Sequence, residues 1–327
     1  MKTERVCSEA LRRIWTGPGE NTGSDYVLGA HLGKAYAGRA ISGAAALVVP
    51  VAALPPRAVG RRTEGFELIP HASLRFAYGG REWTAPAAAL TCADPELLDA
   101  FVVLAADIHG RLPEEPNGDW ESILAAVEEW QSLMAPRGRP DADAEVGLWG
   151  ELWLLASSAS PDRLIAGWRG PDGDAADFVL DGRAAEVKTA RQRRRHHVSL
   201  AQVADPVGTH EAWLVSIWVG IDPIRGLTVP ALIDEIMARV DDPGTALRRL
   251  IGAGYSPADR LSYEGRFVVL AQPEWYPVVS VPRVRSADPG VTQIRYVVTL
   301  DETLAVPEAD AATLWAHFVG RDDGDAT

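Results

Sequence analysis

The sequence contains too few cysteines for a covalent framework. Its 327 residues include only Cys7 and Cys92, which lie far apart, so neither a disulfide scaffold nor a cysteine-based zinc site is available. The seven histidines do not pair with one another or with cysteine at the spacings of zinc ligands. The sequence therefore gives no indication of a zinc site built on cysteine or histidine.

Long apolar runs are also absent. The first twenty residues have no apolar segment of the kind found in secretory signals. The most apolar stretch, residues 44–54, is too short to span a bilayer and contains Pro50. With 47% hydrophobic and 24% charged residues, the composition is that of an ordinary globular protein. We therefore expect a cytoplasmic protein that makes no membrane contact.

Lysine is scarce in a chain that is acidic overall. The net charge of −13 disfavours non-specific binding of nucleic acids. Of the 32 basic residues only Lys2, Lys34 and Lys188 are lysines, a bias typical of GC-rich coding sequences. A lysine kept within a strand then suggests a task that guanidinium does not perform, such as orienting water or transferring a proton. Lys188 is such a residue.

Breaks in the sequence pattern predict three regions. Residues 1–138 form a β-rich N-terminal domain with a closing helix at 119–134, and the Pro- and Gly-containing segment 135–140 ends it. Residues 139–255 form the central core, and residues 256–327 add strands and a helix that pack on this core.

Alternating and helical apolar spacings place the individual elements. Strands are expected at 47–52, 65–69, 74–78, 81–84, the second half of 97–109, 212–219, 266–271 and 292–300. Helices are expected at 119–134, 145–157, 230–240, 244–251 and 308–319.

The segment 176–188 has the pattern of a tight hairpin. Asp181-Gly182 between two strand-like runs predicts a two-residue type I′ turn. Counting outward from this turn places Asp177 opposite Glu186, with Cβ atoms about 4.5–5.5 Å apart on one face. Lys188, two residues further along the strand, shares that face. Opposed carboxylates destabilise a sheet unless a cation separates them, so the pattern predicts a Mg²⁺ site beside an ammonium group.

Two neighbouring features fit such a site. Glu151 is an acidic residue within the otherwise apolar helix at 145–157. The run 191–197, RQRRRHH, is densely cationic in an acidic chain. Such a run is usually a solvated face, but directly after a carboxylate–lysine cluster it suits the neutralisation of phosphates.

The order of these residues resembles the PD-(D/E)XK nuclease superfamily, in which a helix glutamate precedes an aspartate and a Glu-x-Lys on a hairpin. The combined pattern resembles a bacterial family of "PD-(D/E)XK motif proteins" found in restriction and phage-defence cassettes. The matching segments are GLWGELWLL (147–155), GWRGPDGDAADF (167–178), AEVKTA (185–190) and the run that leads to Gln202. One departure is Ala176, where the family pattern leads us to expect histidine.

The resemblance implies an α/β (α+β) fold. Its centre is a restriction-endonuclease-like core with a mixed sheet flanked by helices, accompanied by a β-rich N-terminal region and a small C-terminal α/β extension. It also implies a role for each matching residue. The metal ligands are Asp177, Glu186, the Val187 carbonyl and Glu151; Lys188 is the motif lysine; Ser199 and Gln202 support the site; Arg191, Arg193, Arg194, Arg195 and His197 bind nucleic acid.

The implied function is that of an endodeoxyribonuclease that uses Mg²⁺ or Mn²⁺. Such a chain would be the cleavage subunit of a restriction or phage-defence system, with DNA, a companion ATPase and a methyltransferase as partners. Two alternatives stay open, a non-catalytic DNA-binding scaffold with a nuclease fold and an RNA-processing nuclease. Homodimerisation, sequence or modification specificity and the cleavage pattern are left undecided by the sequence.

Overall fold

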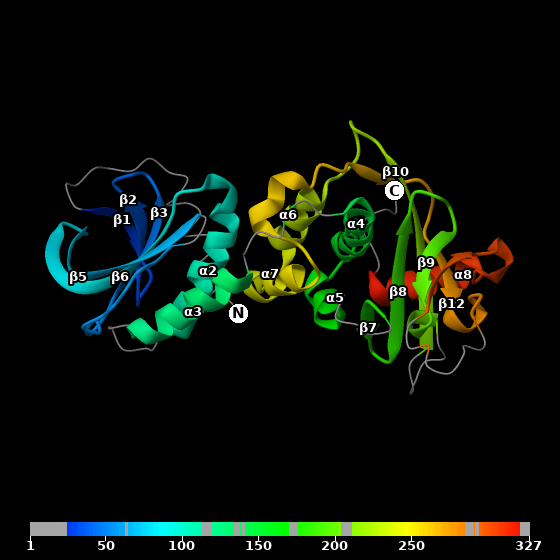
Figure 1. The fold of residues 1–327 in the computed structure, drawn as a ribbon, viewed down its shortest axis with the longest axis horizontal. Coiled ribbons are helices and arrows are strands. Elements are labelled where there is room, and N and C mark those ends of the chain that lie inside the picture. The colour runs from blue at the N-terminus through cyan, green and yellow to red at the C-terminus, as the bar shows by residue number, and fades with distance from the viewer. Residues whose placement is uncertain are drawn as a thin grey trace. The chain divides into compact units, whose positions relative to one another are not determined.

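The computed structural model describes residues 25–62, 65–112, 119–133, 138, 141–169, 176–203, 211–284, 291 and 294–320. Cys7, most of the segment 135–140 and the start of the strand expected at 292 lie outside these residues. The described residues form two compact units (Figure 1). Residues up to 133 form the first unit together with 241–248 and 256–258, and the other described residues form the second. The three-part division at 138 and 255 stays a prediction.

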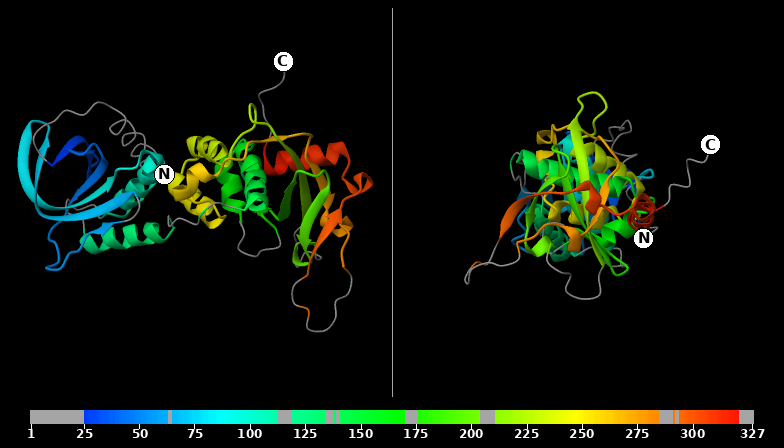
Figure 2. Two further views of the ribbon diagram at one scale, coloured as in Figure 1. Left: turned by 45° about the horizontal axis from the view of Figure 1, so that its top comes forward. Right: turned by 90° about the vertical axis from the view of Figure 1, so that its right-hand side faces the viewer.

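The first unit is built on a six-stranded antiparallel sheet with the order β1-β2-β3-β6-β5-β4. Its strands are β1 (Tyr26–His31), β2 (Tyr36–Ala40), β3 (Ala45–Pro50), β4 (Arg61–Arg62), β5 (Phe66–Tyr78) and β6 (Arg81–Cys92). Both Gly79 and Gly80 have positive φ, which confirms the predicted tight turn between β5 and β6. A register shift between His71 and Leu74 bends this hairpin, and the bend is visible in Figure 2.

Two helices follow this sheet, and one of them corrects a sequence-based prediction. Residues 97–109, expected to end as a strand, begin with a 3₁₀ turn (Pro95–Leu97) and continue as helix α2 (Leu98–Arg111). Phe101 stacks on Phe66 of the sheet with a ring separation of 5.7 Å. Because α2 is buried on several sides, its apolar residues show no clear period, and only the length of the run favours a helix. Helix α3 (Trp120–Leu133) is confirmed.

The second unit contains a mixed sheet with the order β11-β10-β8-β7, to which β12 adds through β10. Its strands are β7 (Phe178–Leu180), β8 (Arg183–Ala190), β10 (Glu211–Ile221), β11 (Phe267–Val269) and β12 (Glu274–Pro277). Strands β8 and β10 are parallel, and the other pairs are antiparallel. A separate antiparallel pair consists of β9 (Arg195–Ser199) and β13 (Arg295–Thr299).

The remaining helices agree with the predicted positions within a few residues, apart from the unpredicted α5. They are α4 (Ala142–Ala156), α5 (Pro161–Gly167), α6 (Val229–Arg239), α7 (Pro243–Gly252), most of which belongs to the first unit, and α8 (Glu308–Phe318). Short 3₁₀ turns cover Ala201–Val203, Pro257–Ser262, Val278–Ser280 and Glu302–Leu304. The side chain of Asp141 caps α4 by accepting a hydrogen bond from the Asp143 N–H at 3.3 Å.

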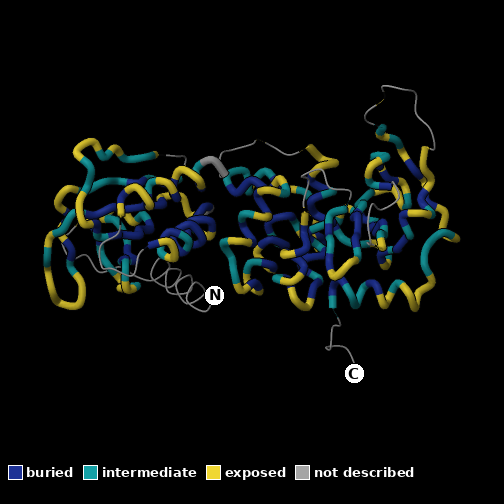
Figure 3. The backbone as a smooth tube through the Cα atoms, turned by 90° about the horizontal axis from the view of Figure 1, so that it is seen from below, coloured by how far each residue is buried: buried dark blue, intermediate teal, exposed yellow. Residues whose placement is uncertain are grey.

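Strand β8 lies between two packed layers. Helix α4 packs on β8 and α6, and the β9–β13 pair contributes Val198 and Val298 to an apolar cluster with Leu214 and Tyr276 of the main sheet. Buried residues run through the interior of this unit (Figure 3). Because β8 lies between α4 and the β9–β13 pair, its charged residues emerge between a helix layer and a strand layer.

None of the described helices is long and apolar enough to cross a membrane.

Two glycines of α4 provide a matched test of how closely this helix approaches β8. A Cβ at Gly150 would overlap the Thr189 hydroxyl, whereas a Cβ at Gly147 meets nothing within 4 Å. We expect Gly150→Ala to lower the free energy of unfolding by about 1–3 kcal/mol through overpacking. Gly147→Ala should raise it by about 0.5–1 kcal/mol, because alanine is the better helix former. Urea unfolding measures both changes, and equal stabilities of the two variants would contradict this packing.

Candidate active site

The hairpin that carries the candidate site has the predicted register. Leu180 pairs with Arg183, Val179 with Ala184, and Phe178 with Ala185. At the turn, Asp181 has φ 46° and Gly182 has φ 77°, the two positive values that a type I′ turn requires. The next opposed pair, one step beyond the ladder, is Asp177 and Glu186.

The edge of β8 is open beyond this ladder. Strand β7 begins at Phe178, while β8 continues to Ala190, so no described strand pairs with the last residues of β8 on that side. The Asp177 side chain lies at the start of this open edge, where its Oδ2 accepts a hydrogen bond from the Val187 N–H at 2.7 Å. Because the N–H and C=O of a strand residue point to the same edge, the Val187 carbonyl faces this edge too.

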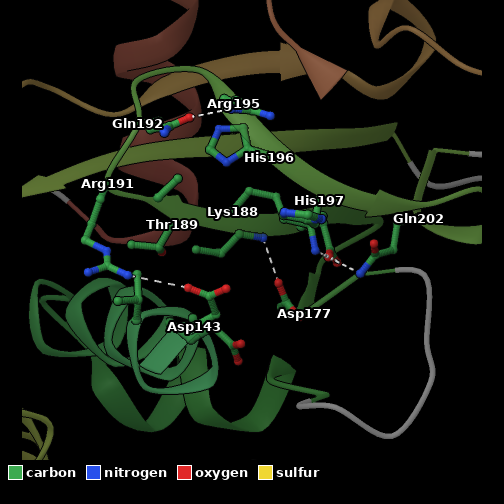
Figure 4. Close-up of a pocket in the computed structure, with 16 residues that line it drawn as sticks. Asp143, Asp177, Lys188, Thr189, Arg191, Gln192, Arg195, His196, His197 and Gln202 are labelled. Atoms are coloured by element: carbon green, nitrogen blue, oxygen red, sulfur yellow. Dashed lines mark hydrogen bonds and ion pairs between the residues drawn. The ribbon is translucent and has the colours of Figure 1, made fainter. Parts of the chain in front are cut away.

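Asp177, Lys188 and Gln202, which Figure 4 labels, line one pocket at this edge together with Glu186. The carboxyl groups of Asp177 and Glu186 lie within hydrogen-bonding reach of each other. Lys188 Nζ lies 2.7 Å from Glu186 Oε1, and Gln202 Nε2 donates a hydrogen bond to the same oxygen. The side chain of Glu186 is 3% exposed, so these four residues lie at the bottom of the pocket that they line.

A third carboxyl group approaches the pair from α4. Glu151 lines the same pocket, and its Oε2 accepts a hydrogen bond of 2.8 Å from Trp168 Nε1. Sequence reasoning missed Trp168, although it lies in the GWRG segment that carries the family resemblance. The indole nine residues before Asp177, within a segment that resembles the family, is the signal that could have identified it.

Burial raises the pKa of all three carboxyl groups, and the charge of Asp177 further raises the pKa of Glu186 and of Glu151. Burial and the charge of Asp177 raise the pKa of Glu186 to about 8. Burial raises the pKa of Asp177 to about 6, although the Val187 N–H and Lys188 oppose the change. Burial, followed by the Asp177 charge, raises the pKa of Glu151 well above its usual value. The site therefore holds more carboxylate than it can ionise at neutral pH without a further cation.

Ser199 and Gln202 hold each other in position. The Ser199 N–H donates to Gln202 Oε1 at 2.9 Å, and the Gln202 N–H donates to Ser199 Oγ at 3.4 Å. With its carbonyl oxygen engaged in this way, the Gln202 amide presents its NH₂ group to Glu186. Both residues thus have the geometry of the predicted support, with Ser199 acting through Gln202.

The cationic run divides between two environments. Arg191, Arg195 and His197 line the pocket, together with the four predicted catalytic residues and Gln202. Arg191 lies at its rim, 3.7 Å from the Asp143 carboxylate (Figure 4). For these residues, contact with nucleic acid stays a prediction.

Arg193 and Arg194 do not line the pocket, and for them too contact with nucleic acid stays a prediction. Arg193 pairs with Glu274 at 2.9 Å and lies over the Trp218 ring. Arg194 donates to Glu274 at 2.7 Å and pairs with Glu302, and its side chain is only 16% exposed. These ion pairs engage both guanidinium groups in holding the turn before β9.

His196 is a second residue that sequence reasoning missed. It is 3% exposed and lines the pocket, and its Nε2 lies 2.8 Å from Ser216 Oγ on β10. Burial and the Lys188 charge lower its pKa to about 4, which keeps the imidazole neutral at pH 7. Because side chains alternate between the two faces of β9, one ring of the pair His196-His197 is buried and the other is exposed. The sequence alone does not specify which of the two faces the interior.

The donor set can be tested against a divalent cation. No three His, Cys, Asp or Glu side chains of the described residues form a metal-binding cluster. Two carboxyl groups do adjoin, however, and Glu186 Oε2 is buried without a hydrogen-bond donor among the described residues. Mg²⁺ commonly takes one or two carboxylates and completes its shell with water. The pair Asp177 and Glu186, with the Val187 carbonyl at the same edge, therefore fits such an ion.

The mixed sheet, the helix glutamate and the Asp…Glu-x-Lys hairpin define a PD-(D/E)XK nuclease-like α+β domain, a class whose members are typically nucleases. The chain belongs to the family described as "Putative PD-(D/E)XK family member (DUF4420)", whose model matches residues 8–301. The resemblance inferred from the sequence is thereby confirmed. Neither the curated proteins nor the solved structures contain a significant match to this chain.

Proposed function

We propose that this protein is a metal-dependent endodeoxyribonuclease. The observation that carries the proposal is the meeting of Asp177 and Glu186 at the open edge of β8. Lys188 Nζ lies 2.7 Å from Glu186, and one buried Glu186 oxygen has no donor within the described part of the chain. A scaffold that had lost catalysis would have no need to keep such a destabilising group of charges.

The chain's own residues have distinct roles in this proposal. Asp177, Glu186 and the Val187 carbonyl would hold Mg²⁺ or Mn²⁺, with Glu151 beside them. When bound, such an ion polarises a phosphate oxygen and lowers the pKa of a coordinated water. Lys188 orients the attacking water and stabilises charge that builds up on the phosphate oxygens.

Two hydrogen bonds keep these ligands in position. Gln202 engages Glu186 Oε1 and leaves Oε2 directed elsewhere, and Trp168 engages one oxygen of Glu151. Fixing ligand side chains in this way limits the reorganisation needed when substrate and metal bind. Trp168 and Gln202 are thus positioning residues for the carboxylates.

Arg191 and Arg195 are the cationic groups best placed for the DNA backbone, since both are exposed and line the pocket. Such contacts are independent of base identity and weaken steeply as salt increases. The preference for DNA, the role as a cytoplasmic cleavage subunit in restriction or phage defence, and the companion ATPase and methyltransferase rest on the family resemblance.

Incubation of the purified chain with supercoiled plasmid tests the proposal. We expect open-circular and linear products with Mg²⁺ or Mn²⁺ and none with EDTA, and slower degradation of a structured RNA at equal concentration. Binding of plasmid without cleavage in either metal would favour the scaffold alternative, and faster cleavage of RNA would favour the RNA-processing alternative.

A further inference from the structure

The first unit carries a cluster of aromatic rings that the nuclease site does not use. Tyr36 lies at its centre, with ring separations of 4.6 Å to His31, 5.6 Å to Tyr78 and 5.6 Å to Trp83. Behind these rings, Phe76 stacks on Trp83 at 5.2 Å with an interplanar angle of 2°. We call His31, Tyr36, Tyr78 and Trp83 the aromatic surface.

The strand pattern explains why this cluster reaches the surface. Leu74, Phe76 and Tyr78 follow one another on one face of β5, and Trp83 on β6 is opposite Phe76. Leu74 and Phe76 are buried, whereas Tyr78, next to the glycine turn, is 36% exposed. The apolar row of this face therefore extends past the core and ends in accessible rings.

The other members of the aromatic surface come from β1 and β2. His31 ends β1 and is exposed, and Tyr36 begins β2 and is half-buried, like Trp83. The rings are held by one another and by buried Phe76, so they present a preformed and rigid platform. Such a platform suits planar ligands because little conformational entropy is lost on binding.

The sequence range that forms this sheet has a small excess of positive charge, in contrast to the chain as a whole. Residues 25–92 contain seven Lys and Arg against four Asp and Glu, whereas the whole chain has a net charge of −13. Arg81 is paired across the hairpin with Tyr78 and shares the face of Trp83. It is exposed and forms no ion pair with any described residue. The aromatic surface is thus flanked by a cation available to an anionic ligand.

We propose that the aromatic surface binds single-stranded nucleic acid, with unpaired bases stacked on Tyr78, Tyr36 and Trp83 and the backbone held by Arg81. Exposed aromatic rings beside a positive charge match both parts of a nucleotide, its planar base and its phosphate. A purely apolar protein partner would gain nothing from the positive charge. This binding is independent of hydrolysis in the second unit, and the proposed function can fail without affecting it.

Fluorescence anisotropy of a labelled 20-nucleotide thymidine strand tests the proposal with the full chain in EDTA, which prevents metal-dependent cleavage. We expect Tyr78→Ala to weaken binding about tenfold or more and Tyr78→Phe to change it less than about threefold, because only the ring is needed for stacking. Arg81→Ala should weaken binding and reduce its salt dependence. The matched controls Ile41→Ala and Arg57→Ala remove an exposed apolar and an exposed basic side chain of the same unit and should have little effect.

Two further comparisons separate base stacking from phosphate binding and from dimerisation. An abasic strand of the same length should bind wild type and Tyr78→Ala equally, because it offers phosphates without bases. Equal affinity of Tyr78→Ala and wild type for the thymidine strand would overturn the proposal, as would an equal loss in Tyr78→Phe and Tyr78→Ala. A concentration-dependent dimer that Tyr78→Ala abolishes, with binding of the strand unchanged, would assign the surface to a second copy of the chain instead.

Discussion

Replacing Lys188 by alanine should reduce plasmid nicking about 100-fold or more while leaving the dissociation constant for DNA within about twofold of wild type. The reason is that the charge of Lys188 lowers the pKa of all three carboxyl groups, and Lys188 Nζ lies 2.7 Å from Glu186 Oε1. Its loss removes the group that positions water and leaves the acids more protonated. Rates of nicking in Mg²⁺ and binding in EDTA give the two values.

Lys188→Arg sharpens this test, because the chain uses arginine almost everywhere else. A guanidinium is larger, planar and always charged, so it should not replace a compact ammonium in the pocket, and we expect activity at least about tenfold below wild type. Lys34→Arg, which changes a lysine that donates to the Leu112 carbonyl in the first unit, is the control and should retain activity. Full activity of Lys188→Arg would show that charge alone is required there.

Replacing Glu186 by glutamine should abolish cleavage and stabilise the metal-free protein at alkaline pH. Its usual pKa of 4.5 is raised to about 8 in the folded state, mainly by burial and by Asp177. Between these values the folded protein binds more protons than the unfolded chain, so stability is highest at acidic pH and is lost as pH rises towards 8. The pKa of Asp177 is raised to about 6, so its ionisation also lowers the stability of the folded protein, at a lower pH than that of Glu186.

Thermal unfolding in EDTA between pH 5 and 8.5 measures this effect. We expect the Tm of Glu186→Gln to equal that of wild type near pH 5 and to exceed it by about 2–4 °C at pH 8, the shift that about 1 kcal/mol causes in a protein of this size. Mg²⁺ should raise the Tm of wild type at pH 8 and not that of the variant. A Tm for Glu186→Gln below that of wild type at pH 8 would contradict the crowded-carboxylate interpretation.

The sequence predicted the register of the hairpin well because its geometry is encoded locally. A two-residue turn needs positive φ at both positions, and Asp181-Gly182 meets that need, so the turn alone sets the register of the hairpin. From that register, the meeting of Asp177 with Glu186 follows within a few residues of chain. Helix α4 was predictable for a similar reason, since its apolar run and its Asp141 cap are contiguous.

Elements whose surroundings come from distant parts of the chain were harder to predict. Helix α2 is buried on several sides, which removes the periodicity that distinguishes a helix from a strand. Arg193 and Arg194 look like phosphate ligands beside Arg191, yet Glu274, about eighty residues later, engages both of them.

By itself, the sequence determined the hairpin, its two opposed acids, the adjacent lysine and the helix that supplies Glu151. The family resemblance implied support from Ser199 and Gln202, but only the tertiary structure decided which group each side chain holds: Gln202, held by Ser199, beside Glu186, Trp168 beside Glu151, and buried His196 near Lys188. The physical reason is that backbone turns and registers depend on neighbouring residues, whereas burial, hydrogen-bond partners and pKa depend on which segments the packed core brings together.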